Sequence, residues 1–80
     1  MGAFERGPIG FKVFAFGWED GIPFLIVLVA TEEVKREIKL MRKNGKWWAQ
    51  GEVEVILDQE EQEFATIMWD GERRKAGVPE

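Results

Sequence analysis

The first third of the chain consists of two long apolar runs separated by a short polar turn. Residues 9–18 are rich in Phe and Val, which favour strands, and residues 22–30 are apolar at every position. Between them stands Glu19-Asp20-Gly21, and Asp and Gly tolerate the positive φ that a tight hairpin turn requires. We therefore predict an antiparallel hairpin whose second strand is covered on both faces.

The next segment changes to a helical period. Three apolar residues recur at i, i+4 and i+7: Val34, Ile38 and Met41. Thr31 is a good N-cap, the residues after it are acidic, and the late residues are basic, as the helix dipole prefers. Gly45 is typical of a helix C-terminus. The pattern predicts a helix over residues 32–43.

Strand-like alternation returns after this segment. Residues 46–57 alternate between apolar and polar side chains, which predicts a half-buried antiparallel strand. Residues 58–61 are acidic and predict a loop, and residues 62–69 predict a returning strand. Asp70-Gly71 then predicts a turn into a short edge strand.

Together these elements predict an α+β fold with the order ββαββ. Two β-hairpins flank one helix, which lies on one face of a mainly antiparallel sheet. Eighty residues make a single domain, residues 1–80, with a loose N-terminal arm at residues 1–8 and a tail at residues 76–80.

The net charge and the length of the apolar runs indicate which partners and locations to expect. Eleven basic and 15 acidic residues give a net charge of −4, which does not favour bulk attraction to nucleic acid or to anionic membranes. The longest apolar run is nine residues, whereas a spanning helix needs roughly 20. No signal-peptide pattern is visible. We expect a soluble, cytoplasmic protein that does not contact a membrane.

The composition also argues against an enzyme. The chain has no His, Cys, Tyr or Ser, so most nucleophiles, the usual general base and the soft metal ligands are missing together. Glu52 and Glu54 share a face of the predicted strand, but catalysis by two carboxylates needs a cleft that so small a sheet lacks. We expect no catalytic residue, no metal and no cofactor.

Aromatic residues in the first strand suggest an interface. Regular alternation puts Phe14, Phe16 and Trp18 on one face, and one helix covers only one face of a small sheet. The alternative is that the N-terminal arm folds over these rings. Leu40 lies off the helical stripe, in either a core contact or a contact between subunits. The leading prediction is a non-enzymatic protein-interaction module that forms a homo-oligomer through its sheet. If it has another partner, we expect a protein.

The alternative function is nucleic-acid binding. Four basic residues in or near the predicted helix would approach an exposed indole: Lys35, Lys39, Arg42 and Lys46, beside Trp48. A basic stripe beside an aromatic ring is a weak nucleic-acid signature. Nearby glutamates and the acidic net charge favour an ordinary solvated helix face instead. Nucleic acid is therefore the less favoured partner.

Overall fold

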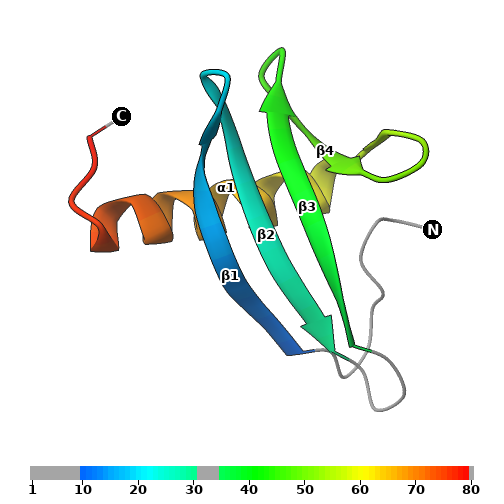
Figure 1. The fold of residues 1–80 in the computed structure, drawn as a ribbon, viewed down its shortest axis with the longest axis horizontal. Coiled ribbons are helices and arrows are strands. Elements are labelled where there is room, and N and C mark those ends of the chain that lie inside the picture. Colours follow the sequence, from blue (N-terminus) through cyan, green and yellow to red (C-terminus); the bar gives the residue numbers. More distant parts are fainter. Residues whose placement is uncertain (1–9, 31–34, 80) are drawn as a thin grey trace.

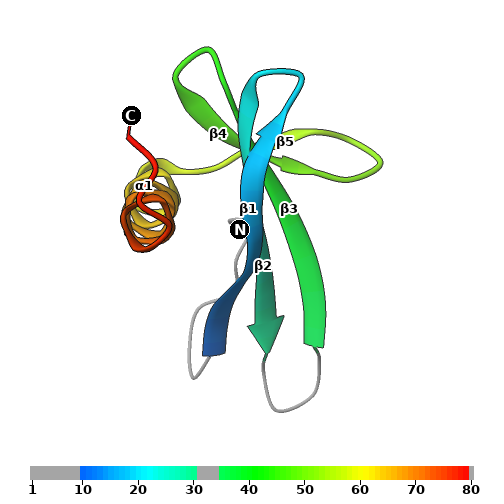
Figure 2. The same cartoon turned by 60° about the vertical axis from the view of Figure 1, so that its left-hand side comes forward.

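In a computed structural model of the chain, residues 10–30 and 35–79 are described. Five strands precede one C-terminal helix: β1 (Gly10–Glu19), β2 (Ile22–Ala30), β3 (Lys35–Lys43), β4 (Lys46–Gln50), β5 (Val55–Ile56) and α1 (Gln59–Lys75). The strands form one antiparallel sheet in their sequence order. Figure 1 shows α1 crossing behind the sheet, with its C-terminal end beyond the β1 edge. Figure 2 shows that α1 lies on one side of the sheet only.

The first hairpin and the α+β class are as predicted, but β2 is covered by α1 on one face and only half-buried on the other. The chain is α+β with an antiparallel sheet, and β2 occupies the predicted residues 22–30. Asp20 and Gly21 have φ values of 54° and 78°, the left-handed conformation that a two-residue hairpin turn requires.

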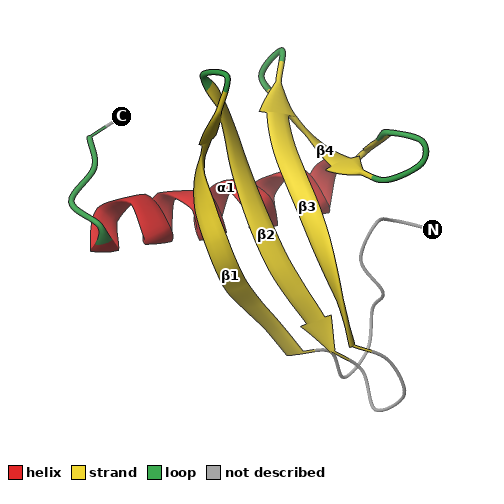
Figure 3. Ribbon diagram, viewed as in Figure 1, coloured by secondary structure: helices red, strands yellow, loops and turns green. Residues whose placement is uncertain are grey.

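The predicted order ββαββ is wrong, because every strand precedes the helix (Figure 3). Residues 35–43 of the predicted helix form β3, while Thr31 lies outside the described residues. The deciding signal is Asn44-Gly45, whose φ values of 54° and 74° make a hairpin turn into β4. The apolar positions of residues 35–43 fit the period of a strand as well as that of a helix. Pairing with β2 and β4 on either side overrides the helical pattern.

The strand predicted over residues 62–69 is wrong too, because these residues lie in α1. The acidic segment before them is a capping box. The Asp58 carboxylate accepts from the Glu61 N–H at 2.9 Å, and the Glu61 carboxylate accepts from the Asp58 N–H at 2.9 Å. Asp70-Gly71 is not a turn but part of the helix, whose last turn holds the basic residues that its dipole favours.

Two smaller predictions also change. The strand predicted over residues 46–57 divides into β4 and β5, with residues 51–54 between them. In the tail, the N–H groups of Gly77 and Val78 donate to the carbonyls of Arg74 and Arg73 at 3.1 Å and 3.0 Å. Gly77 has a φ of 70°, so the start of the tail closes the helix end. The arm predicted at residues 1–8 lies outside the described residues.

Trp47 anchors α1 to the sheet. Its side chain is fully buried, and its indole Nε1 donates to Thr66 Oγ1 at 3.2 Å. The Gln62 side chain forms two hydrogen bonds with the backbone of Trp47. Its Oε1 accepts from the Trp47 N–H at 2.7 Å, and its Nε2 donates to the Trp47 carbonyl at 2.8 Å. Trp69 adds aromatic contacts, with its centroid 6.0 Å from Trp47 and 5.6 Å from Phe16. These contacts hold α1 against one face of the sheet.

Candidate functional site

The strand pairing divides the sheet into two faces. Residues of β2 that point toward α1 are fully or almost fully buried: Leu25, Val27 and Val29. The residues that alternate with them point the other way, and we call that side the helix-free face. Its large apolar side chains are Phe14, Phe24, Ile26, Leu28, Met41, Trp48 and Ile56. Its basic side chains are Lys12, Lys35, Lys39, Lys43 and Lys46.

The two kinds of basic residue in the strands are separated by face. Every lysine of the described strands is on the helix-free face. The two strand arginines, Arg36 and Arg42, alternate with these lysines along β3 and so lie on the face that α1 covers. The helix-free face is therefore the lysine-bearing side of the sheet.

Charge is also divided along the chain. Residues 10–50 contain seven Lys and Arg against five Asp and Glu, whereas residues 51–80 contain three against nine. The segment that forms β1–β4 thus has a surplus of two positive charges, and the segment that forms β5 and α1 has a surplus of six negative charges. The acidic net charge of the protein therefore comes from its C-terminal part, which includes Glu54 beside the strand lysine Lys43.

Acidic side chains partly balance the helix-free face, on which Glu37 lies between Lys35 and Lys39 along β3. Lys39 Nζ lies 2.6 Å from Glu19 Oε1, and Lys43 pairs with Glu54. Hydrogen bonds from Lys43 and Gln50 lower the pKa of the Glu54 carboxyl. Among the described residues, no ion pair involves the remaining three lysines of the face: Lys12, Lys35 and Lys46.

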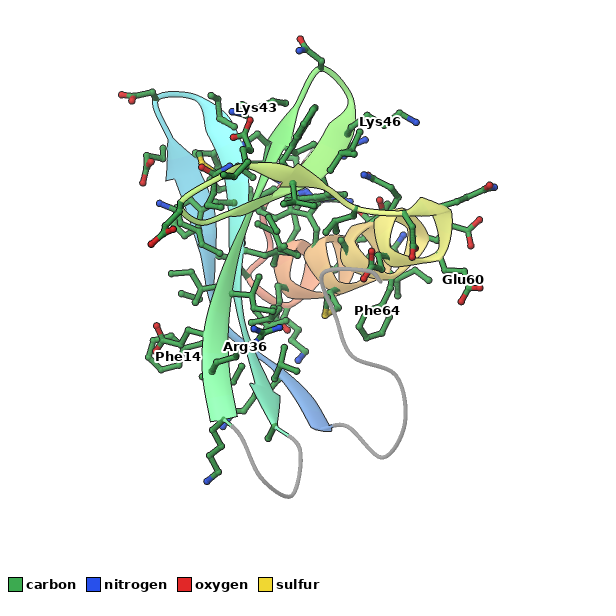
Figure 4. The ribbon with its side chains drawn as sticks, turned by 90° about the vertical axis from the view of Figure 1, so that its right-hand side faces the viewer. Phe14, Arg36, Lys43, Lys46, Glu60 and Phe64 are labelled. Carbon is green, nitrogen blue, oxygen red and sulfur yellow. The ribbon has the colours of Figure 1, made fainter. Side chains whose placement is uncertain are left out.

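Three aromatic rings lie among these lysines. Phe14 is 60% exposed, and Figure 4 shows it pointing away from α1. Phe24 is half-buried, with Lys39 Nζ 5.2 Å from its ring centroid. Trp48 is half-buried, and its Nε1 donates to the Lys43 carbonyl at 3.3 Å. The rings come from β1, β2 and β4, so they span most of the sheet.

The predicted aromatic interface does not exist as one surface. The pairing of β1 shifts between Val13 and Ala15, and the extra residue of this β-bulge is Phe14. Phe16 and Trp18 therefore return to the side of α1, where their rings lie 5.6 Å and 5.1 Å from Trp69. Phe14 remains on the opposite face.

Leu40, the fourth predicted interface residue, is fully buried in the core. This agrees with the core contact that the sequence left open. Trp18 is still 47% exposed at the β1 edge, and whether it meets a partner remains a prediction.

Most of the predicted nucleic-acid residues share one face of the sheet. Lys35, Lys39, Lys46 and Trp48 share the helix-free face, but Arg42 does not. Its guanidinium carbon lies 6.0 Å from the Trp47 ring on the covered face. Positions i and i+4 share a face in a strand as in a helix, whereas position i+7 does not.

Sequence reasoning missed Lys12, Phe14 and Phe24 as members of this group. They come from the first hairpin, far from β3 in sequence, and antiparallel pairing places them beside it. A strand assignment for residues 35–43, taken with the predicted first hairpin, would have found Phe24. Lys12 and Phe14 reach this face through the β-bulge, which had no sequence signal.

Other kinds of site have little support in the described part of the chain. No group of three or more acidic residues there is placed to hold a metal ion. A shallow depression at the start of α1 is lined by Asp58, Gln59, Glu60 and Glu63, where acids already stabilise the helix dipole. The expected lack of catalysis, metal and cofactor remains a prediction. No helix among these residues has the length and apolar character needed to cross a bilayer.

No protein-family model, curated protein or solved structure matches the chain. We therefore infer its function from its own geometry.

Proposed function

We propose that this protein is a non-enzymatic binding module that holds single-stranded nucleic acid on its helix-free face. The observation that carries the proposal is that five lysines and three aromatic rings share the helix-free face, with three glutamates on or at the rim of it: Glu19, Glu37 and Glu54. Lysines attract the phosphate backbone and release its counterions. Aromatic rings offer flat surfaces on which unpaired bases stack.

Single strands suit this face better than a duplex. Stacking on Phe14, Phe24 or Trp48 requires bases that are free of their neighbours. Duplex DNA is read by elements that enter a groove, most often an exposed helix. The only helix among the described residues lies on the other side of the sheet and has an acidic first turn.

The acidic net charge does not oppose this proposal once the charges are located. Of the nine acidic residues in 51–80, five lie in α1 on the opposite side of the sheet, together with three basic residues. Positive charge that is gathered locally creates a local attractive potential, whatever the total.

Binding of a fluorescent single-stranded oligonucleotide, measured by anisotropy at two salt concentrations, tests the proposal. We expect affinity to fall steeply with salt, because each neutralised phosphate releases counterions. Lys35→Glu combined with Lys39→Glu should weaken binding strongly. The control Lys75→Glu makes the same kind of charge change on α1 and should have a much smaller effect.

A pair of tryptophan variants tests stacking. Trp48→Ala should cost about 1–3 kcal/mol of binding free energy if a base stacks on the ring. Trp18→Ala removes a half-exposed ring from the other side of the sheet and should leave affinity nearly unchanged. Absence of binding at low salt, or equal losses for the two variants, would contradict the proposal.

A second candidate is self-association through the same face, favoured by the half-buried aliphatic side chains of Ile26 and Leu28 beside the rings. Pairing two copies would bring ten lysines together, which makes this candidate the weaker one. Light scattering on the wild type and on Phe14→Glu tests it. If the protein binds no nucleic acid and forms a dimer that Phe14→Glu dissociates, self-association through this face replaces the first proposal.

A further inference from the structure

The outer side of α1 carries a second surface, separate from the helix-free face. Glu61, Ala65 and Trp69 recur every four residues and are buried against the sheet. On the opposite side of the helix, the spacing i, i+4, i+8 and i+11 aligns four residues: Glu63, Ile67, Gly71 and Arg74. We call this row the outer stripe. Ile67 lies at its centre and is 69% exposed, so a large aliphatic side chain projects where it gains nothing from the folded chain.

Gly71 is the second observation. A glycine in a helix interior costs roughly 1 kcal/mol relative to alanine. The backbone does not require it, because the positive-φ glycines of the described residues are Gly21, Gly45 and Gly77. The protein itself does not crowd it either, since a Cβ built at Gly71 meets no atom within 4 Å. Close approach of a second molecule would explain a glycine here.

We propose that the outer stripe pairs with the same stripe of a second copy, with the two helices antiparallel. In this arrangement Ile67 of each copy fills the notch over Gly71 of the other. A twofold axis near residue 69 makes both contacts at once, because an isologous interface uses the same patch twice. Ile67 and Gly71 are four residues apart on the same side of the helix, so the side chain of Ile67 in each copy packs into the space over Gly71 in the other.

Charge complementarity supports this occupant. The same axis places Glu63 of one copy opposite Lys75 of the other, with Arg74 one residue away. Glu63 and Arg74 are both exposed, and neither forms an ion pair among the residues that the structure describes. Antiparallel pairing therefore brings the acidic start of each helix to the basic end of its partner. Parallel pairing would bring like charges together.

The dimer leaves the proposed binding face open. The helices meet on the side of the sheet opposite the helix-free face, so the two helix-free faces point outward. Pairing through the outer stripe does not depend on nucleic-acid binding, and the two proposals fail separately.

Sedimentation equilibrium of the full chain over a wide concentration range tests the pairing. We expect reversible dimers and a dissociation constant that Ile67→Asp raises about a hundredfold or more, because it places an unpaired charge in the contact. Ile67 is exposed in the monomer, so this variant should keep its circular dichroism spectrum. Phe14→Glu is the matched control: it adds a charge on the helix-free face and should leave the dimer intact.

Gly71→Ala separates pairing from helix stability. Alanine favours the helix of each monomer, so dilute samples should unfold at a higher denaturant concentration. The added methyl fills the notch and should weaken the dimer about tenfold. If Gly71→Ala makes the monomer more stable and the dimer weaker, damage to the fold cannot explain the weaker dimer.

Charge reversal tests the antiparallel direction. Glu63→Lys should weaken the dimer a few-fold, and adding Arg74→Glu and Lys75→Glu should restore it. Glu52→Lys, the same change in the β4–β5 loop, is the control and should have no effect. The proposal is overturned if the wild type stays monomeric at the highest attainable concentration. It is also overturned if Ile67→Asp remains a dimer, or if Phe14→Glu dissociates the dimer and Ile67→Asp does not.

Discussion

The two faces of the sheet are built from the same strands but carry different side chains. The covered face holds Leu25, Val27, Leu40 and Trp47, which are completely buried. The helix-free face holds lysines and aromatic rings that are partly or largely exposed. Because successive residues of a strand point to opposite faces, one segment of sequence supplies both surfaces. Stability and the proposed binding should therefore respond separately to mutation of neighbouring residues.

Trp47 and Trp48 give the largest expected contrast. Trp47→Ala should lower the free energy of unfolding by about 3–5 kcal/mol, because it empties a fully buried site and removes the bond to Thr66. Trp48→Ala should lower it much less, since the ring is half-buried on the open face. Urea unfolding followed by circular dichroism measures both values. Equal losses would show that the two faces do not differ as described.

Phe14 and Phe16 repeat the contrast across the β-bulge. Phe16→Ala removes a ring that packs on Trp69 and should cost about 2–3 kcal/mol of unfolding free energy. Phe14→Ala changes an exposed residue and should stay within about 0.5 kcal/mol of the wild type. The same unfolding experiment decides between this bulged register and a regular one, in which the two residues would share a face.

The covered face depends on where α1 begins. Asp58→Ala removes the side chain that caps the helix and should cost about 1 kcal/mol. Asp58→Asn keeps a capping oxygen and should cost less. Thermal or urea unfolding measures both variants, and a neutral Asp58→Ala would mean that packing alone determines the start of the helix.

The smallest expected effect concerns Glu54, at the rim of the helix-free face. Its pKa is lowered by hydrogen bonds from Lys43 and Gln50, so it should titrate below an unperturbed glutamate in a carboxyl-detected NMR experiment. A lowered folded pKa means that this contact stabilises the protein above the unfolded pKa and is lost as pH falls through the folded pKa. Lys43→Met should raise the pKa of Glu54 toward its ordinary value. An unchanged pKa would exclude the Lys43 contact in solution.

Local signals in the sequence determined the first hairpin. The apolar run of β2 and the Asp20-Gly21 turn need no distant partner to be recognised, and both were predicted correctly. The signals for the second half were equally local. Asn44-Gly45 marks a hairpin and Asp58 with Glu61 marks a helix start. They were outweighed by the helical spacing around Ile38 and by the alternation after it.

Only the tertiary structure decided which residues share a surface. Lys12 and Lys39 are far apart in the chain. Their strands, β1 and β3, pair with the two edges of β2, which places both lysines on the same face of the sheet. The bulge at Phe14 turns Phe16 and Trp18 toward α1, because one extra residue reverses the facing of the rest of the strand. The net charge belongs to the sequence as a whole, but the packing decides which acids lie near the lysines: α1 holds five acids on the covered side, while Glu54 pairs with Lys43. Periodicity assigns residues to faces within one element, whereas pairing and packing between elements bring those faces together.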